Sequence, residues 1–461
     1  MSMRKFLHCF KIFLLISVVF YTIPVYAVTE STTKVFYVNE IKGKDTNDGL
    51  TPRRAFKTVQ RAKKAAEEAV CYSDVEVKLS NGIYYVDDGL NFTNVQNYGG
   101  DFQITFCPQI EGGEVIISGG KEIAGFEIFD VEKNIYRAPW TKACRQLYIN
   151  GTPAVRARSK GHMGFEFNND LTAFESKNKE ILSWQNAKQA ELVFKKEFVS
   201  RRVMIDSVEE KNDTAVIKMN KSTTYTLTNT AGVLLKAGES PWYIENAYEL
   251  LDEGGEWYHD GEYIYYKPLE DQKIESAVIS DVEKPINIAG TSQSHVKGLL
   301  FKNITFSHGS WMLPTNKREF IDSQNNYDGN CIETVPAVVN IEFGEHIEFD
   351  GCTFKNSGAN GLNIMNGSKK IIVQNSEFCN LSAVGIQIGT LASIDNDNII
   401  EEIIVRNNRI HDCGIEYRSA SGLAYVCAKN CSFLNNEIYN LPYSGIHTGW
   451  GWNYWKNTVT E

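Results

Sequence analysis

The chain has 461 residues, of which 43% are hydrophobic and 23% are charged, and its formal net charge at pH 7 is −10. Such an acidic chain is a poor candidate for nucleic-acid binding, because contacts to phosphates need clustered lysine and arginine. The composition is compatible with a neutral or weakly charged polymer, such as a polysaccharide.

Residues 1–27 have the layout of a secretory signal peptide. Three basic residues precede the apolar stretch IFLLISVVF at 12–20, and Val25 and Ala27 occupy the −3 and −1 positions of a cleavage site. The segment contains no acidic residue, so its cleavage would shift the net charge from −10 to −13. We therefore expect a secreted, extracellular protein with a bacterial-type signal peptide and no membrane association after cleavage. An uncleaved anchor is the alternative, since residues 6–25 are almost long enough to span a bilayer.

The cysteines predict neither a disulfide scaffold nor a metal site. Of the ten cysteines, Cys9 lies in the signal segment, which leaves an odd number dispersed along the chain without a CxxC pair. Disulfide scaffolds are small and dense in cysteine. We expect most of these thiols to be small buried hydrophobic groups, and we expect no metal and no cofactor.

Residues 28–150 are predicted to form an N-terminal cap and the first coils of a solenoid. Residues 34–70 indicate a strand, a Gly/Asp turn and an amphipathic helix whose apolar face contains Ala62, Ala66 and Ala69. Such a helix could cover the open edge of a repeat protein. Residues 72–150 continue as strands separated by glycine turns.

Residues 151–275 are predicted to form an inserted β-rich subdomain. They lack the repeat described next and contain antiparallel-looking pairs, such as GEWYHDGEYIYYKPL at 255–269, a hairpin around Asp260 and Gly261.

Residues 276–461 contain a repeat of short strands. It recurs as FKNITFSH (301–308), FDGCTFKN (349–356), VQNSEFCN (373–380), VRNNRIHD (405–412) and FLNNEIYN (433–440). One apolar register comprises Phe306, Phe354, Phe378, Ile410 and Ile438. A polar register two residues later comprises Asn356, Asn380, Asp412 and Asn440. Short strands in a fixed register predict an all-β parallel solenoid, with asparagine ladders along the stack. A β-sandwich with chance similarity is the alternative.

Several segments resemble glycoside hydrolase family 141. They are YVNEIKGKDTNDGLTPRRAFKTVQRA (37–62), VIISGGKEIAGF (115–126), RQLYINGTPAVRAR (145–158), GEWYHDGEYIYYKPLE (255–270) and LPYSGIHTGWGWNYW (441–455). The resemblance covers roughly residues 35–455. It implies a secreted right-handed parallel β-helix of the pectate-lyase-like superfamily, and it implies α-L-fucosidase or xylanase-like activity. The same helix also carries lyases, so the resemblance is weaker for substrate than for fold.

Proteins of this kind usually continue with further coils after the GWGW segment, which include an acidic Asp-Gly-Gly stretch. The printed sequence stops at WKNTVTE. We therefore expect the solenoid to be truncated at its C-terminus. Either the sequence is a fragment, with a further catalytic acid beyond the chain end, or the protein is a truncated and inactive paralogue.

Asp412 and Glu416 are the predicted catalytic residues. Glycoside hydrolysis needs two carboxyl groups across the scissile bond. Asp412 replaces asparagine in the polar register, and Glu416 lies in the loop insertion 413–422. The alternatives are a structural carboxylate that accepts amide hydrogen bonds for Asp412, and a solvated loop charge for Glu416.

A second set of residues is predicted to bind substrate. Asn363, Gln387 and His447 should alternate outward on one strand register and form the polar floor of a groove. Aromatic rings that stack on the C–H faces of sugars are expected from Tyr417, Trp311, Trp450 and Trp452. A structural histidine and core positions for the tryptophans are the alternatives.

Together these features predict a secreted carbohydrate-active protein. The preferred function is a glycoside hydrolase that cleaves a plant or microbial polysaccharide by carboxylate acid/base catalysis. The alternatives are a non-catalytic carbohydrate-binding or surface β-helix protein and, less favoured, a polysaccharide lyase. The expected partner is a polysaccharide or oligosaccharide, and the protein is expected to be a monomer.

Overall fold

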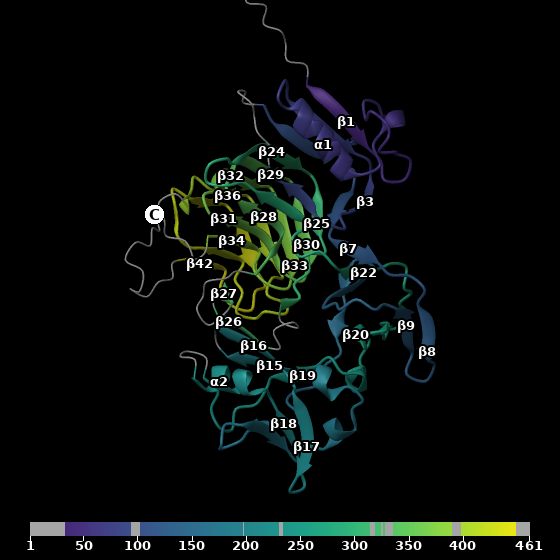
Figure 1. The fold of residues 1–461 in the computed structure, drawn as a ribbon, viewed down its shortest axis with the longest axis vertical. Coiled ribbons are helices and arrows are strands. Elements are labelled where there is room, and N and C mark those ends of the chain that lie inside the picture. The colour runs from purple at the N-terminus through teal and green to yellow at the C-terminus, as the bar shows by residue number, and fades with distance from the viewer. Residues whose placement is uncertain are drawn as a thin grey trace, which may run out of the picture. The chain divides into compact units, whose positions relative to one another are not determined.

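Three parallel sheets, each built from strands of successive turns of the chain, form the first part of the architecture (Figure 1). The first contains β1 (Lys34–Val38), β2 (Val75–Leu79), β5 (Ile104–Pro108), β24 (Val296–Lys302), β29 (Gly344–Asp350), β32 (Lys369–Gln374), β35 (Ile400–Glu401), β36 (Ile404–Arg406), β39 (Ala428–Lys429) and β40 (Ser432–Leu434). The second contains β3 (Gly82–Tyr85), β6 (Val115–Ser118), β25 (Thr305–Ser307), β30 (Thr353–Ser357), β33 (Glu377–Leu381), β37 (Arg409–His411) and β41 (Glu437–Tyr439). The third contains β4 (Leu90–Phe92), β23 (Ile286–Ala289), β28 (Ala337–Glu342), β31 (Asn360–Met365), β34 (Ile386–Ile388), β38 (Leu423–Tyr425) and β42 (Ile446–Thr448).

These elements come from a computed structural model. It describes residues 33–93, 102–196, 198–229, 234–313, 319–323, 326–327, 335–389 and 398–448. Residues 33–461 form one unit, to which every statement below refers. Within the described residues, no helix is long and apolar enough to cross a membrane.

The apolar register predicted from the repeat is confirmed. Phe306 pairs with Phe354, Phe354 with Phe378, Phe378 with Ile410 and Ile410 with Ile438, all in parallel strands. The rings of Phe354 and Phe378 stack with centroids 4.3 Å apart and planes 4° apart. Because side chains alternate across a strand, one apolar residue per coil repeats inward. Phe306, Phe354, Phe378 and Ile410 belong to one buried core, and the partly buried Ile438 packs against it.

The polar register has a backbone cause as well as a side-chain one. Asn356, Asn380, Asp412 and Asn440 all have left-handed backbones, with φ between 50° and 54°. Asparagine and aspartate tolerate this region better than most residues, which explains their recurrence at the turn after each strand. The expected side-chain ladder is present where Asn440 donates to Asp412. Asn356 instead donates to the carbonyl of Gly151 at 2.8 Å.

The predicted N-terminal helix is α1 (Val59–Ala69). The hydroxyl of Thr58 caps it by accepting a hydrogen bond from the backbone N–H of Arg61 at 3.2 Å. The alanine face is buried in the same core as β1 and β2, which α1 contacts.

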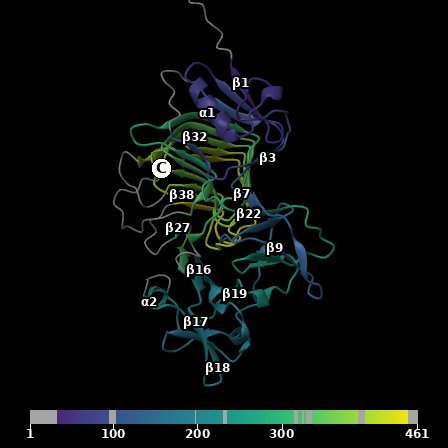
Figure 2. The ribbon, with the colours of Figure 1, turned by 45° about the vertical axis from the view of Figure 1, so that its right-hand side comes forward.

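Four sheets, antiparallel except for one parallel pair of strands, form the second part of the architecture and are called the antiparallel sheets below (Figure 1). One contains β7 (Gly120–Glu122), β10 (Leu147–Ile149), β11 (Thr152–Pro153) and β22 (Ala277–Ser280), and another contains β8 (Glu127–Asp130), β9 (Ile135–Pro139), β12 (Val155–Arg156), β20 (Glu256–His259) and β21 (Tyr263–Tyr266). A third contains β13 (Glu166–Phe167), β14 (Ala173–Ser176), β17 (Ser207–Lys211) and β18 (Thr214–Lys218), and both views show the β17–β18 hairpin (Figure 2). The fourth contains β15 (Glu191–Lys196), β16 (Val199–Met204), β19 (Tyr243–Glu245), β26 (Glu319–Ser323) and β27 (Asn326–Tyr327), and a short helix, α2 (Lys221–Asn229), follows β18.

The all-β prediction is confirmed, and the chain combines parallel stacks of strands with antiparallel sheets. The predicted hairpin is present, since Trp257 pairs with Tyr266 across the turn at Asp260. The antiparallel strands begin before residue 151, because β7 and β8 already belong to antiparallel sheets. Local alternation predicts a strand but not the direction of its partner, so residues 120–150 could not be distinguished from coils.

Candidate active site

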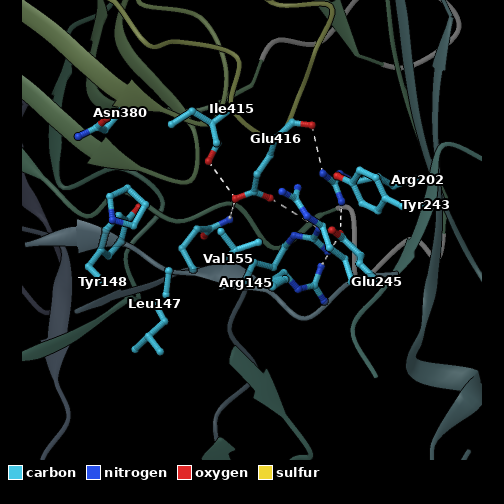
Figure 3. Close-up of a pocket in the computed structure, with 16 residues that line it drawn as sticks. Arg145, Leu147, Tyr148, Val155, Arg202, Tyr243, Glu245, Asn380, Ile415 and Glu416 are labelled. Atoms are coloured by element: carbon cyan, nitrogen blue, oxygen red, sulfur yellow. Dashed lines mark hydrogen bonds and ion pairs between the residues drawn. The ribbon is translucent and has the colours of Figure 1, made fainter. Parts of the chain in front are cut away.

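A cavity of about 300 Å³ lies where the antiparallel sheets meet the loop that follows β37 (Figure 3). Its lining residues come from five segments that are remote in sequence. They are Arg145, Gln146, Leu147, Tyr148, Pro153, Ala154, Val155, Arg156, Arg158, Arg202, Tyr243, Glu245, Asn380, Ser382, Ile415 and Glu416. This volume is at the lower end of the roughly 300–1,000 Å³ typical of small-molecule sites.

The backbone of the preceding coil holds Glu416 in this cavity. The N–H groups of Ile415 and Glu416 donate to the carbonyls of Leu381 and Ser382 at 3.1 and 3.2 Å. Gly414 starts this loop with a φ of 71°, a conformation that glycine adopts without strain. The guanidinium of Arg202 also donates to the Glu416 carbonyl at 3.1 Å. The loop is therefore fixed to both parts of the architecture.

The carboxylate of Glu416 accepts hydrogen bonds from two side chains. Gln146 Nε2 and Ser382 Oγ donate to Oε1 at 3.0 and 2.9 Å. The Glu416 side chain points towards Arg145 (Figure 3), and Arg145 Nη2 lies 3.9 Å from Glu416 Oε2. The side chain is 19% exposed. Gln146 and Ser382 donate to Oε1, and Arg145 is a cationic neighbour of Oε2, which suits a carboxylate that acts as a base, nucleophile or charge stabiliser.

A buried ionic cluster forms one wall of the cavity. Arg145 and Arg156 both donate to Glu191, at 2.8 and 3.2 Å, and Arg156 and Arg202 both contact Glu245. Burial raises the pKa of Glu191, but the fields of Arg145 and Arg156 lower it more, so its pKa lies well below the usual range. The cluster therefore stays charged and fixes the guanidinium groups that face the cavity.

The structure places Trp311 and Tyr417 in the protein interior rather than on a groove. They are 2% and 0% exposed, and their rings lie 5.0 Å apart, edge to face. Val335, Ala359 and Ala383 pack around them. Tyr417 follows Glu416 directly and is buried, and the guanidinium of Arg202 lies 5.6 Å from its ring centre, so Tyr417 anchors the loop. Aromatic composition alone does not distinguish a core ring from a ligand platform.

The predicted polar floor is in register, but most of it is buried. Asn363 pairs with Gln387, Gln387 with Ala424 and Ala424 with His447 on the third sheet. Asn363 and Gln387 are 2% and 0% exposed, and Asn363 donates to the carbonyl of Val335 at 2.9 Å. His447 is half-buried, and burial lowers its pKa. None of these residues lines the cavity that contains Glu416.

Asp412 does not line this cavity either. Its carboxylate contacts His411 Nδ1 at 2.7 Å and accepts from Asn440. These contacts match the structural alternative for Asp412. Trp450 and Trp452 lie outside the described residues.

Of the residues that line the cavity, only Glu416 was predicted from the sequence as a site residue. Gln146 and Ser382 belong to no catalytic motif, and Arg145, Arg156 and Arg158 belong to the segment RQLYINGTPAVRAR. That segment offered the one usable signal, because three arginines within fourteen residues of an acidic chain are unusual. Among the described residues, no group of three or more His, Cys, Asp or Glu side chains is placed to hold a metal ion.

Comparisons with known proteins agree with this architecture. Residues 134–269 match the model of the GH141 insertion domain. A solved structure described as a glycoside hydrolase is 24% identical, with a TM-score of 0.80, and the match covers 91% of this chain and 80% of that one. This likeness shows the shared fold. No curated protein sequence matches the chain.

Two more distant structures also match. One is a complex of XylC with xylose (11% identity, TM-score 0.48, 88% of this chain and 59% of that one). The other is a GH136 lacto-N-biosidase from Eubacterium ramulus (9% identity, TM-score 0.34, 90% of this chain and 55% of that one). At these TM-scores neither carries weight for this chain.

Proposed function

We propose that this chain is a GH141-like glycoside hydrolase that uses Glu416 as one of its two catalytic carboxyl groups. The observation that carries the proposal is the cavity in which Glu416 accepts from Gln146 and Ser382 beside Arg145. The similarity of residues 134–269 to the GH141 insertion domain and the fold shared with a glycoside hydrolase support the reaction class. The substrate is a plant or microbial polysaccharide or oligosaccharide.

Glu416 acts as the base or nucleophile of the pair. Both of its close side-chain partners donate to Oε1, so the carboxyl group is held as a hydrogen-bond acceptor, which is the form that serves as a base or nucleophile. Glu245 is the other carboxylate among the described lining residues, and it is tied to Arg156 and Arg202. Glu245 therefore holds the cationic wall, and a different carboxyl group serves as the acid. Retaining and inverting pairs are separated by about 5–5.5 Å and 6.5–9.5 Å.

The three parallel sheets form one right-handed β-helix, capped by α1 and interrupted by the antiparallel sheets. This interpretation rests on strands that enter the three sheets in turn, as β28, β29, β30 and β31 do. Export through the signal segment at 1–27 would bring the protein to extracellular glycans.

A screen of purified protein against fucosylated, xylan and pectic glycans tests this function. We expect release of reducing ends from at least one glycan, without the ultraviolet absorbance of an unsaturated uronate. That absorbance would instead identify a lyase. Binding without turnover on every glycan would identify a carbohydrate-binding module and contradict the proposal.

A further inference from the structure

Two aromatic rings beside the cavity carry three cationic side chains. Trp242 is 45% exposed, and its ring lies 4.9 Å from that of Tyr243, which lines the cavity. The guanidinium of Arg158 lies over Tyr243 at 5.2 Å, and that of Arg418 lies over Trp242 at 5.9 Å. The ammonium of Lys195 lies over the same Trp242 ring at 5.3 Å.

We call Trp242, Tyr243, Arg158, Arg418 and Lys195 the aromatic–cationic patch. Within the part of the chain that the structure describes, its two arginines lack the carboxylate partners that the arginines of the ionic cluster have. Arg145, Arg156 and Arg202 share Glu191 and Glu245 as partners. Arg158 and Arg418 form no ion pair with any described carboxylate, and Arg418 Nε is buried without a hydrogen-bond partner among the described residues. Burial lowers the pKa of Arg418, and the charge of nearby Arg158 lowers it further. An anion between the two guanidinium groups would relieve both effects.

The patch is adjacent to the proposed reaction site. Arg418 lies two residues after Glu416 in the same loop, and Arg158 and Glu416 line one cavity. An exposed indole offers a face for the C–H groups of a sugar ring, and a guanidinium matches the geometry of a carboxylate. Because the chain as a whole is acidic, an anionic glycan would be repelled elsewhere and attracted here.

We propose that Arg158, Arg418 and Trp242 form a subsite for an anionic sugar, one that carries a carboxylate or a sulfate, next to the bond cleaved at Glu416. The proposal rests on the proposed function for the identity of the ligand as a glycan. It assigns the substrate class, which is a glycan with uronic acid or sulfated units rather than a wholly neutral one.

Calorimetric binding of matched oligosaccharides tests the subsite. The probes are a uronic acid oligosaccharide, a sulfated one and a neutral one of equal length. The variants are Arg158→Gln and Arg418→Gln. Arg137→Gln is the matched control, because Arg137 also lies over a tyrosine ring, that of Tyr263 at 4.6 Å, but does not line the cavity. Equal melting temperatures verify folding.

We expect each subsite variant to weaken binding of an anionic probe by about tenfold, since charged hydrogen bonds contribute at about this level. Affinity for the neutral probe and for all probes in the control should stay within about twofold. A preference for the uronate over the sulfated probe would identify the carboxylate as the recognised group, the reverse preference would identify the sulfate, and either supports the subsite. Equal losses on neutral and anionic probes, or no loss, would overturn it.

The outcomes separate the subsite from the function on which it rests. Hydrolysis of a glycan without any preference for anionic probes would overturn the subsite alone. Anion-selective binding that depends on Arg158 and Arg418, with no hydrolysis of any glycan, would overturn the proposed function alone.

Discussion

The parallel stack and the antiparallel sheets place their charges differently. Inside the stack of three parallel sheets, one apolar residue per coil repeats, and the Phe354 and Phe378 rings stack. None of the buried Asp, Glu, Lys or Arg side chains among the described residues lies in these sheets. The antiparallel sheets bury the cluster of Arg145, Arg202 and Glu191 at 0–2% exposure. The stack therefore gains stability from apolar contacts that recur in every coil. The cluster instead depends on ion pairs between residues that follow no sequence repeat. The candidate active site lies beside the cluster.

Removing a ring from the stack should have the largest effect on stability. Phe354→Ala leaves a cavity between Phe306 and Phe378, and we expect a loss of about 4 kcal/mol, as for other buried phenylalanines. Chemical denaturation monitored by circular dichroism measures it. Phe354→Leu, which fills most of the space, is the control and should lose less. Equal losses in the two variants would show that the stack is not packed as described.

Neutralising one member of the ionic cluster should have the next largest effect. Glu191→Gln keeps the shape but leaves Arg145 and Arg156 with one carboxylate fewer, and we expect a loss of about 3 kcal/mol. The pKa of Glu191 is lowered in the folded protein, so its contribution is present above its unfolded pKa and persists well into acid. Denaturation at neutral pH measures the loss. An unchanged stability would contradict the paired cluster.

His308 allows a pH-dependent comparison, and within about one pH unit below 6.5 its effect is smaller than the two above. Its burial lowers its pKa from 6.5 to about 3, so the unfolded chain binds a proton that the folded chain does not. The neutral form therefore stabilises the fold above pH 6.5, and this contribution is lost as pH falls towards 3. His308→Asn keeps a residue that tolerates its φ of 63°. Between pH 6.5 and 3, the free energy of unfolding of the wild type should fall by about 1.4 kcal/mol per pH unit because of His308, and the variant should lack this decrease. Parallel slopes in both proteins would contradict a buried neutral histidine.

Charges on the outer face of the stack should matter least. Arg409 lies between Glu377 and Glu437, at 3.1 and 3.7 Å, and all three are solvated. Exposed pairs are screened by water and salt. Arg409→Gln should leave the melting temperature unchanged within error, and a clear decrease would show that surface and buried charges are not distinct in this protein.

The sequence could predict the stack because its evidence is local and repeated. Phe306, Phe354 and Phe378 share a register that follows from spacing alone, and pairing in the structure matches it. Helix α1 was predictable for the same reason, since its alanine spacing lies within a dozen residues, whereas its Thr58 cap was seen only in the structure.

The candidate site could be predicted only in part. Glu416 was selected because it lies in a loop inserted into the repeat, but its partner Gln146 is 270 positions away. No local pattern reports such a contact. Trp311 and Tyr417 were expected to bind sugar because they are aromatic and lie in insertions, yet both are buried. Side-chain chemistry is the same in a core and in a groove, and only the packing decides between them.

We infer that the catalytic carboxylate is Glu416, which is held between the parallel stack and the antiparallel sheets. The most direct test of this inference compares the hydrolysis rates of Glu416→Gln and Asp412→Asn on the best glycan, in folded preparations of equal melting temperature. Glu416 accepts from Gln146 in the cavity, whereas Asp412 accepts from Asn440 outside it. We expect Glu416→Gln to lose at least about a hundredfold in kcat/KM and Asp412→Asn to stay within about threefold of the wild type. Full activity in Glu416→Gln, with a large loss in Asp412→Asn, would contradict the account.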